Sequence, residues 1–338
     1  FISKEGIKTE NFEKDLFILR KKLEKLSLNP DYKDFYIPSL SSRTIVYKGL
    51  ITAPKLRDFY LDLQDEDYET AFAIFHQRYS TNTFPNWKLA HPFRMLAHNG
   101  EINTISANRN WLKAKEQDIR EVWGDLADII LPITNDTDSD SASLDNAVEF
   151  LVHSGKDILT AINVLVPRAW ENDDRLTPEE KAFYEYFACI FESWDGPAAI
   201  AFTDGKIIGG KLDRNGLRPA RYIITNDVIL MASEVGVIEF PEEEVVLKGR
   251  LGPGDKIALD LESGKIYFSE EIIDLLVKDK KYKEWVESNI VPFIPAKETP
   301  EIDYKEVLKE LITFGYDKDE INMVVKEMAL KGVEPTYS

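Results

Sequence analysis

The spacing of apolar residues predicts helices in the first half of the chain and again near its end. The amphipathic period of about 3.6 residues recurs in separate stretches among charged residues, which are residues 10–27, 105–117, 143–152 and 270–289. Thr177-Pro-Glu-Glu180 has the capping-box pattern with proline at the first helical position. We therefore expect a helix over 178–192, and further helices after residue 303.

Runs of β-forming residues between turns predict strands. In the first hundred residues these runs are 34–42, 43–51, 71–81 (AFAIFHQRYST) and 94–100 (RMLAHNG). After residue 197 short runs separated by Gly, Asn and Asp follow one another, namely PAAIAFTDG, KIIGGKLD, ARYIITN, DVILMAS, DKIALDLES and GKIYFSE. Helices followed by a strand-rich block predict a layered α+β sandwich.

A proline-rich stretch divides the sequence into two parts. Residues 291–300 (VPFIPAKETP) contain three prolines, which is typical of a linker. We therefore assign residues 1–290 to one domain, and residues 291–338 to the linker and the beginning of another module.

Composition and charge exclude several kinds of partner. The chain has 60 acidic and 42 basic residues, a net charge of −18, which argues against binding nucleic acid or an anionic membrane surface. No apolar run approaches the roughly 20 residues that span a bilayer, and the first residues do not form a secretory signal. We expect a cytoplasmic protein. The single cysteine, Cys189, excludes an internal disulfide and is expected to be a small buried apolar residue.

A first polar segment, His76 to Thr83, follows the predicted strand 71–81 at its end. Arg78 would place a guanidinium near several hydroxyl groups, which suits fork-like recognition of a carboxylate. An isolated arginine of this kind is more often a partner in a surface ion pair.

A second polar segment, Ala97 to Glu101, also ends a predicted strand. Asn99 can present a side-chain N–H, and Gly100 allows its backbone N–H to approach a ligand closely. Together they can form a donor pair for an oxyanion. An Asn-Gly pair alone is more often a simple turn.

A third segment, Asn135 to Ser141, alternates aspartate with other polar residues before a helix. A calcium loop would begin at Asp136. It is disfavoured, because its sixth position would then be Ser141 rather than Gly and its twelfth Ala147 rather than Glu. No metal site is therefore assigned. The aspartates and serines either cap the helix or supply a carboxylate for a substrate ammonium group. A fourth segment, Asp213 to Pro219, is interpreted as a charged hairpin loop.

These segments, in this order, resemble the class II glutamine amidotransferases, and among them the glutamate synthases. The resemblance extends over essentially the whole chain and rests on HQRYSTNTFPNWKLAHPFRMLAHNGEINT, SDSASLD, WDGPAAIAFTDG, DRNGLRPARY, KGRLGPGD and the tail KGVEPTYS. It implies a four-layer αββα sandwich of the N-terminal-nucleophile hydrolase type with a helical C-terminal extension. Residues 1–290 would be the amidotransferase domain without its N-terminal portion, and 291–338 would lead into the central domain.

The resemblance also implies roles for five residues in binding L-glutamine. Arg78 matches the arginine that pairs with the substrate α-carboxylate, and Thr81 matches a nearby contact. Asn99 and Gly100 match the oxyanion hole, and Asp140 matches the carboxylate that holds the α-ammonium group.

Other polar residues of these segments receive weaker or different assignments. Asp136 and Asp138 are weaker candidates for the ammonium contact, and His76 and His98 are interpreted as structural. The loop from Arg214 to Arg218 is expected to shape the wall of the pocket, and no particular contact is assigned to it.

The nucleophile of this family is an N-terminal cysteine, and residue 1 here is Phe1. We therefore expect the polypeptide as given to bind glutamine without hydrolysing it. The resemblance implies no cofactor in this chain, but FMN and an iron–sulfur cluster in the intact enzyme. There, ammonia would combine with 2-oxoglutarate to give glutamate.

The implied partners are the central and C-terminal glutamate synthase modules, with a small electron-transfer subunit or ferredoxin. The residues do not distinguish NADPH, NADH and ferredoxin as electron donors, and they leave the oligomeric state open. The alternative is a non-catalytic glutamine-binding or assembly module derived from the same fold.

Overall fold

The computed structural model describes residues 12–32, 35–79, 84–278, 280–291, 293–295 and 301–334. The chain divides into two compact units, of which the first ends at Asn289 and the second begins at Ile290.

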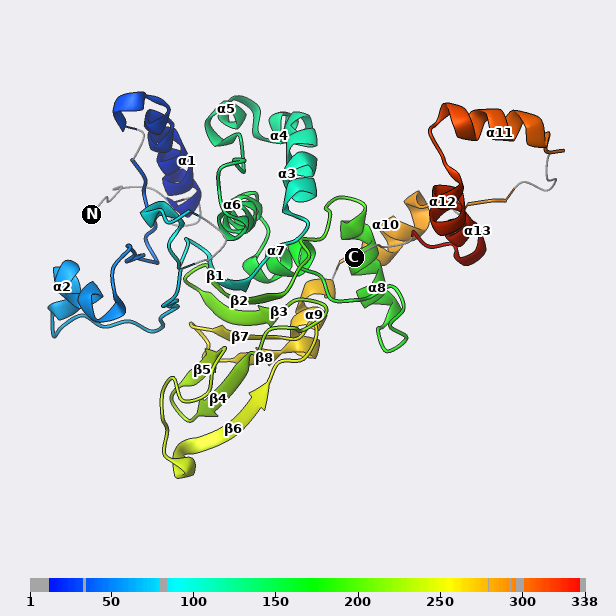
Figure 1. The fold of residues 1–338 in the computed structure, drawn as a ribbon. Helices are drawn as coiled ribbons and strands as arrows, with labels where there is room; N and C mark the ends of the chain where they lie inside the picture. Colours follow the sequence, from blue (N-terminus) through cyan, green and yellow to red (C-terminus); the bar gives the residue numbers. More distant parts are fainter. Residues whose placement is uncertain are drawn as a thin grey trace. The chain divides into compact units, whose positions relative to one another are not determined.

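A helix forms in each stretch of the first unit where the sequence predicts one, and the unit contains further helices that were not predicted (Figure 1). The predicted capping box is present in α8. The Thr177 hydroxyl accepts the backbone N–H of Glu180, and the Glu180 carboxylate accepts the backbone N–H of Thr177. The bounds are α1 Phe12–Glu24, α2 Leu56–Phe59, α3 Ile105–Ala114, α4 Glu116–Trp123, α5 Ala127–Ile130, α6 Asp140–His153, α7 Ile158–Leu165, α8 Pro178–Ala188, α9 Ser269–Val277 and α10 Tyr282–Asn289.

Two antiparallel sheets are formed almost entirely by the strand-rich block. One sheet has the order β1-β2-β3-β7-β8 and the other the order β5-β4-β6. The strands are β1 Leu96–Gly100, β2 Ala198–Thr203, β3 Ile207–Leu212, β4 Arg221–Thr225, β5 Ile229–Ala232, β6 Val245–Arg250, β7 Lys256–Asp260 and β8 Ile266–Phe268. Strand β1 comes from far earlier in the chain and pairs antiparallel with β2, with Asn99 opposite Ala199.

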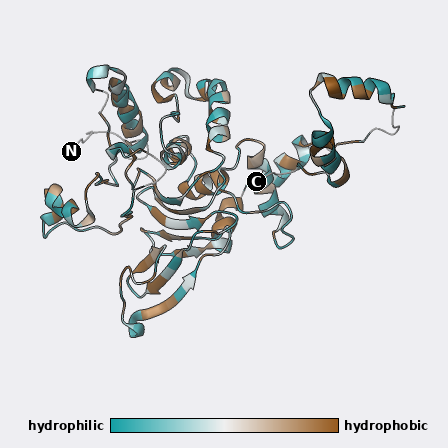
Figure 2. Cartoon of the chain, in the orientation of Figure 1, coloured by the Kyte–Doolittle hydropathy of each residue, from teal (hydrophilic) through white to brown (hydrophobic). Residues whose placement is uncertain are grey.

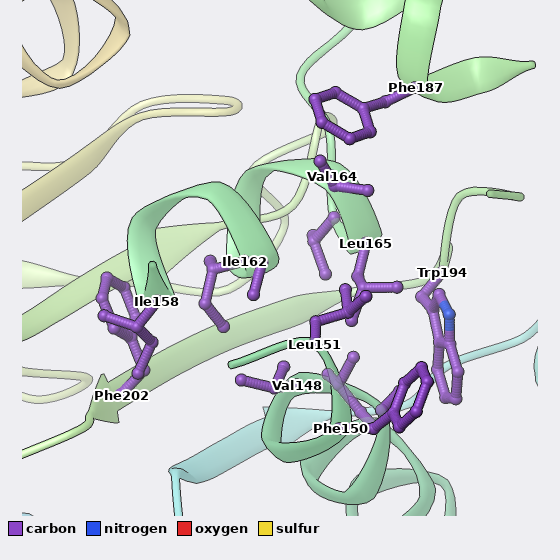
Figure 3. Packing of buried hydrophobic residues seen from close by; sticks show 14 of the residues in the cluster. Val148, Phe150, Leu151, Ile158, Ile162, Val164, Leu165, Phe187, Trp194 and Phe202 are labelled. Carbon is purple, nitrogen blue, oxygen red and sulfur yellow. The ribbon is translucent and has the colours of Figure 1, made fainter. Parts of the chain in front are cut away.

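The larger core lies between the five-stranded sheet and the helices on one of its faces. Side chains of α6 and α7 meet the inward side chains of β1 and β2 there. Figure 3 shows Ile158 and Ile162 of α7 near Phe202 of β2, and Leu165 near Leu151 of α6. Figure 2 shows that hydrophobic residues predominate in α7 and recur along the strands. Every residue of α7 is buried, so no side of this helix faces solvent.

A second, smaller core lies between the two sheets. Leu212 and Ile257 of the larger sheet pack with Ile224 of the smaller one. The sheets approach so closely that a Cβ atom at Gly210 would lie 1.9 Å from the Sδ atom of Met231. A larger residue at this crossing would therefore force the Met231 side chain to move.

The predicted strands 34–42, 43–51 and 71–81 are wrong as far as the described residues reach. Residues 35–51 and 72–79 are extended or irregular, and in the described part of the chain they pair with no neighbouring strand. Residues 71–77 still alternate between exposed and half-buried side chains, as β-forming residues do in extended backbone. Local sequence favours extension here, but a strand also needs a partner.

The predicted α+β sandwich with a helical C-terminal part is confirmed. One layer of helices covers the five-stranded sheet, and the three-stranded sheet packs on its other face (Figure 1). The second unit contains α11 Tyr304–Thr313, α12 Lys318–Glu320 and α13 Lys326–Lys331. No helix among the described residues is long and apolar enough to cross a bilayer.

Candidate functional site

The C-terminal end of β1 carries Asn99 and Gly100. Their neighbour His98 is buried on the helix-covered face of the sheet, and the pleat turns Asn99 to the opposite face. Gly100 has φ +152°, and a Cβ atom there would lie 1.7 Å from the carbonyl oxygen of Pro197. Only glycine fits this position. The Asn-Gly pair is therefore the end of a strand that pairs with β2, and it is not a turn.

Asp140 lies at the first residue of α6, beside the end of β1. Its Oδ2 atom accepts the backbone N–H of Ile102 at 2.8 Å, and its Oδ1 atom accepts the backbone N–H of Ser141 at 2.7 Å. The side chain is half-buried. A carboxylate has about four acceptor positions, so Asp140 retains capacity for a further donor such as an ammonium group.

A second contact joins the same two elements. The Nδ1 atom of His98 lies 2.7 Å from the Oγ atom of Ser141. Burial lowers the pKa of His98 to about 4, although the nearby charge of Asp140 opposes the shift. The imidazole is therefore neutral at pH 7 and acts as a hydrogen-bonding link between β1 and α6. This geometry agrees with the structural interpretation of His98.

The loop that follows β1 is fastened to the loop before β2. Asp195 accepts the backbone N–H of Asn103 through its carbonyl oxygen at 2.7 Å, and its own N–H donates to the hydroxyl of Thr104 at 2.9 Å. Arg214 forms an ion pair with the Asp195 carboxylate. The Arg214–Arg218 loop, to which the sequence assigned no contact, therefore reaches this wall of the site.

Arg78 lies apart from the network just described. It is exposed and follows an extended segment instead of a sheet strand. Two residues earlier, His76 stacks on His91 with ring centroids 4.5 Å apart, and its charge would lower the pKa of His98. The Arg78 segment thus passes close to β1. Thr81 lies outside the described residues.

The two weaker aspartate candidates are engaged elsewhere. The exposed carboxylate of Asp136 pairs with Lys113 at 2.9 Å. Asp138 accepts the side-chain amide of Asn146 at 3.3 Å, and burial raises its pKa. Of the three aspartates, Asp140 is the one that contacts the end of β1. In the described part of the chain no group of three His, Cys, Asp or Glu side chains is arranged to hold a metal ion.

Sequence reasoning missed the fully buried Asp145. Its carboxylate accepts the backbone N–H groups of Met95 at 2.8 Å and Leu96 at 3.1 Å, which fixes the start of β1 to α6. Burial, with the nearby charge of Glu149, raises the pKa of Asp145 to about 6. The only sequence signal is a second aspartate in SDSASLD, a little more than one helical turn after Asp140.

The expectation that Cys189 is buried is wrong. It is exposed at the C-cap of α8, past the inward-facing Phe183 and Phe187. The helix ends at Ala188, so Cys189 lies just beyond the part of α8 that packs against the core.

With this geometry in place, comparison with known proteins identifies the class. Residues 1–285 match the family described as class-II glutamine amidotransferases, and the chain belongs to this family. Its similarity to glutamate synthases is confirmed by curated relatives. The NADPH glutamate synthase large chain of Bacillus subtilis is 45% identical over 331 residues, which cover 97% of this chain and 22% of that protein.

Two further relatives give the same result. Ferredoxin-dependent glutamate synthase 1 of Arabidopsis thaliana is 44% identical over 97% of this chain and 21% of its own length. The NADPH glutamate synthase large chain of Azospirillum brasilense is 43% identical over 97% and 22%. The chain thus spans about a fifth of the length of these relatives.

A solved structure is a more distant match. The glutamine phosphoribosylpyrophosphate amidotransferase of B. subtilis is 19% identical with a TM-score of 0.29, covering 57% of this chain and 34% of that one. A likeness this distant places no individual residue.

Proposed function

We propose that the chain is the amidotransferase part of a glutamate synthase and that it binds L-glutamine at the end of β1. Residues 1–290 would be the amidotransferase domain, and residues 291–338 the linker and the beginning of the central domain. The extent of the family match and the division of the structure after Asn289 support this assignment.

The contact between Asp140 and Ile102 carries the proposal. It brings the carboxylate at the start of α6 to within two residues of Gly100, although the two segments are 38 residues apart in sequence. A cation-binding group and an amide donor pair thus lie at one strand end, as binding of an amino acid with an amide side chain requires.

Each site residue then has a defined task. Asp140 would receive the α-ammonium group, and Arg78, with Thr81 nearby, would pair with the α-carboxylate. The Asn99 side chain and the Gly100 N–H would face the side-chain amide carbonyl, where negative charge develops during hydrolysis. The only cysteine, Cys189, lies at the end of α8, so these residues would bind glutamine without hydrolysing it.

In the intact protein, a cysteine nucleophile would release ammonia for reductive transfer to 2-oxoglutarate, giving glutamate. The central and C-terminal modules, with FMN and an iron–sulfur cluster, would perform that second step. Electrons would come from a pyridine nucleotide through a small electron-transfer subunit, or from ferredoxin. A cytoplasmic location stays a prediction.

Isothermal titration of the chain with L-glutamine tests the proposal. We expect a saturable heat with L-glutamine and none with D-glutamine, because the ammonium and carboxylate contacts fix one stereoisomer. Arg78→Ala should weaken binding at least tenfold through loss of a charged hydrogen bond.

The matched control is Arg57→Ala, which removes another exposed arginine, on α2, and should leave affinity unchanged. Absence of any heat with the unaltered chain, or equal affinity for both stereoisomers, would refute glutamine binding.

A further inference from the structure

Arg109 of α3 holds the loop that leads into Asp140. Its Nη2 atom donates to the carbonyl oxygen of Asp138 at 2.5 Å and lies 3.4 Å from that of Ser139. Its Nη1 atom donates to the carbonyl oxygen of Asp136 at 3.2 Å. A single planar guanidinium thus contacts three main-chain oxygens immediately before Asp140.

The same guanidinium contacts α6 itself. The Oγ atom of Ser143 accepts from Arg109 Nε at 3.1 Å and from Nη2 at 2.9 Å. Ser143 also donates to the carbonyl oxygen of Ser139 at 3.0 Å. The residues on both sides of Asp140 are therefore tied to one side chain of another helix.

The three serines of the segment SDSAS thus have three different partners. Ser139 caps the helix by accepting the N–H of Ala142 at 3.1 Å, Ser141 contacts His98, and Ser143 contacts Arg109. Asp140 therefore lies between residues that contact His98 of β1 on one side and Arg109 of α3 on the other.

Helix α3 is itself anchored, so Arg109 is a fixed support. The adjacent Asn108 is buried and donates to the carbonyl oxygen of Ser193 at 3.0 Å, and Thr104 contacts Asp195 just before the helix. The acceptors that Arg109 contacts among the described residues are carbonyl oxygens and a hydroxyl. None of these contacts is to the Asp140 carboxylate.

We propose that Arg109 is a positioning residue for the ammonium subsite. It fixes the backbone of Ser139 and Asp140 so that the carboxylate faces the end of β1, and it does not touch the ligand. The inference rests on the proposed function, because it assigns Arg109 to the recognition of the α-ammonium group of glutamine.

Two ligands separate this role from a general structural one. L-Glutamine carries the α-ammonium group, and 4-carbamoylbutanoate is the same molecule without it. We expect Arg109→Ala to weaken L-glutamine binding ten- to a hundredfold by titration calorimetry, and to change the affinity for 4-carbamoylbutanoate less than twofold. Asp140→Asn should show the same selective loss.

Lys113→Ala is the matched control. Lys113 lies one helical turn after Arg109 and pairs with the exposed carboxylate of Asp136 on the same loop. Among the described residues its side chain donates to the carboxylate of Asp136, and no hydrogen bond joins it to Ser139 or Ser143. We expect this variant to bind both ligands as the unaltered chain does.

Ser143→Ala keeps the test decisive if Arg109→Ala does not fold. It removes one acceptor of the guanidinium and should produce a smaller loss, three- to tenfold, again only for L-glutamine.

If the unaltered chain and Arg109→Ala bind L-glutamine equally, the inference is overturned while the proposed function stands. An equal loss of both ligands in Arg109→Ala would also overturn it, because the role would then be general. If the unaltered chain binds no glutamine, the proposed function fails, and this inference fails with it.

Discussion

The imidazole of His98 and the hydroxyl of Ser141 lie 2.7 Å apart, between residues that are 43 positions apart in sequence. His98 precedes Asn99 of the candidate oxyanion hole, and Ser141 follows Asp140 of the candidate ammonium subsite. This contact therefore sets the spacing of the two halves of the site, and its loss should be measurable in stability.

Ser141→Ala should destabilise the chain by about 1–3 kcal/mol, because it leaves a ring nitrogen of the buried His98 without its partner. Urea unfolding monitored by tryptophan fluorescence measures this difference. The control is Ser106→Ala, an exposed residue of α3, which should stay within about 0.5 kcal/mol. Equal effects of the two substitutions would mean that the contact does not form.

Gly100→Ala should be strongly destabilising, because the added Cβ atom would lie 1.7 Å from the Pro197 carbonyl oxygen at φ +152°. Displacement of backbone is required, so we expect a loss of about 3 kcal/mol or more in urea unfolding. Gly124→Ala is the matched control. It also has positive φ, at +54°, but its Cβ would meet nothing within 4 Å, so about 1 kcal/mol is expected. Similar losses at both glycines would contradict the strand-end geometry.

Arg20→Ala should cost about 3–5 kcal/mol, because it removes the partner of a buried carboxylate. Arg20 is 2% exposed and pairs with Glu149 of α6 and, at 2.6 Å, with Glu24. The double variant Arg20→Met/Glu149→Leu should recover most of this loss, since neither charge then remains buried.

Lys55→Ala provides the reference for this network, because its pair with Asp58 is exposed and should contribute under 1 kcal/mol. If Arg20→Ala cost no more than Lys55→Ala in urea unfolding, α1 would not be joined to α6 through buried charge.

The chain should lose stability as the pH falls from 6.5 to 5. The pKa of each of its four histidines is lowered, mainly by burial, to about 4 for His98 and about 2 for His91. Below pH 6.5 the histidines of the unfolded chain bind protons, whereas those of the folded chain stay neutral. The free energy of unfolding therefore decreases by about 1.4 kcal/mol per pH unit for each histidine that stays neutral.

Asp145 acts in the opposite direction, because its pKa is raised to about 6 and protonation favours the folded state as the pH falls. The pKa of Asp138 is also raised by burial, and the two carboxyls offset only part of the effect of the four histidines, so a net loss of roughly 2–4 kcal/mol is expected between pH 6.5 and 5. Urea midpoints at the two pH values measure it. A midpoint that stays constant or rises would show that the histidines are not buried and neutral.

Local patterns predicted much of the fold. The apolar period gave α1, α3 and α6, the capping box gave α8, and turn residues delimited most strands after residue 197. Strand β6 was missed because Val245–Arg250 mixes apolar and basic residues on a largely exposed strand. Helix α7 was missed because Ile158–Leu165 is a short, largely apolar run, and such a run does not distinguish a buried helix from a buried strand.

Segments 34–51 and 71–81 show the opposite failure. Their β-forming residues favour extended backbone, and the structure has extended or irregular backbone at the described positions. Strand formation is a property of two segments, so composition alone cannot decide it.

The family, most of the local elements and the chemical groups available to the site follow from the order of amino acids alone: a guanidinium, a carboxylate and an amide donor pair. Which of these groups meet depends on how the elements pack. The contacts of Asp140 with Ile102, His98 with Ser141 and Arg109 with Ser143 join residues 38, 43 and 34 positions apart. Such contacts form when α6 packs on β1 and α3, and no local period specifies that packing.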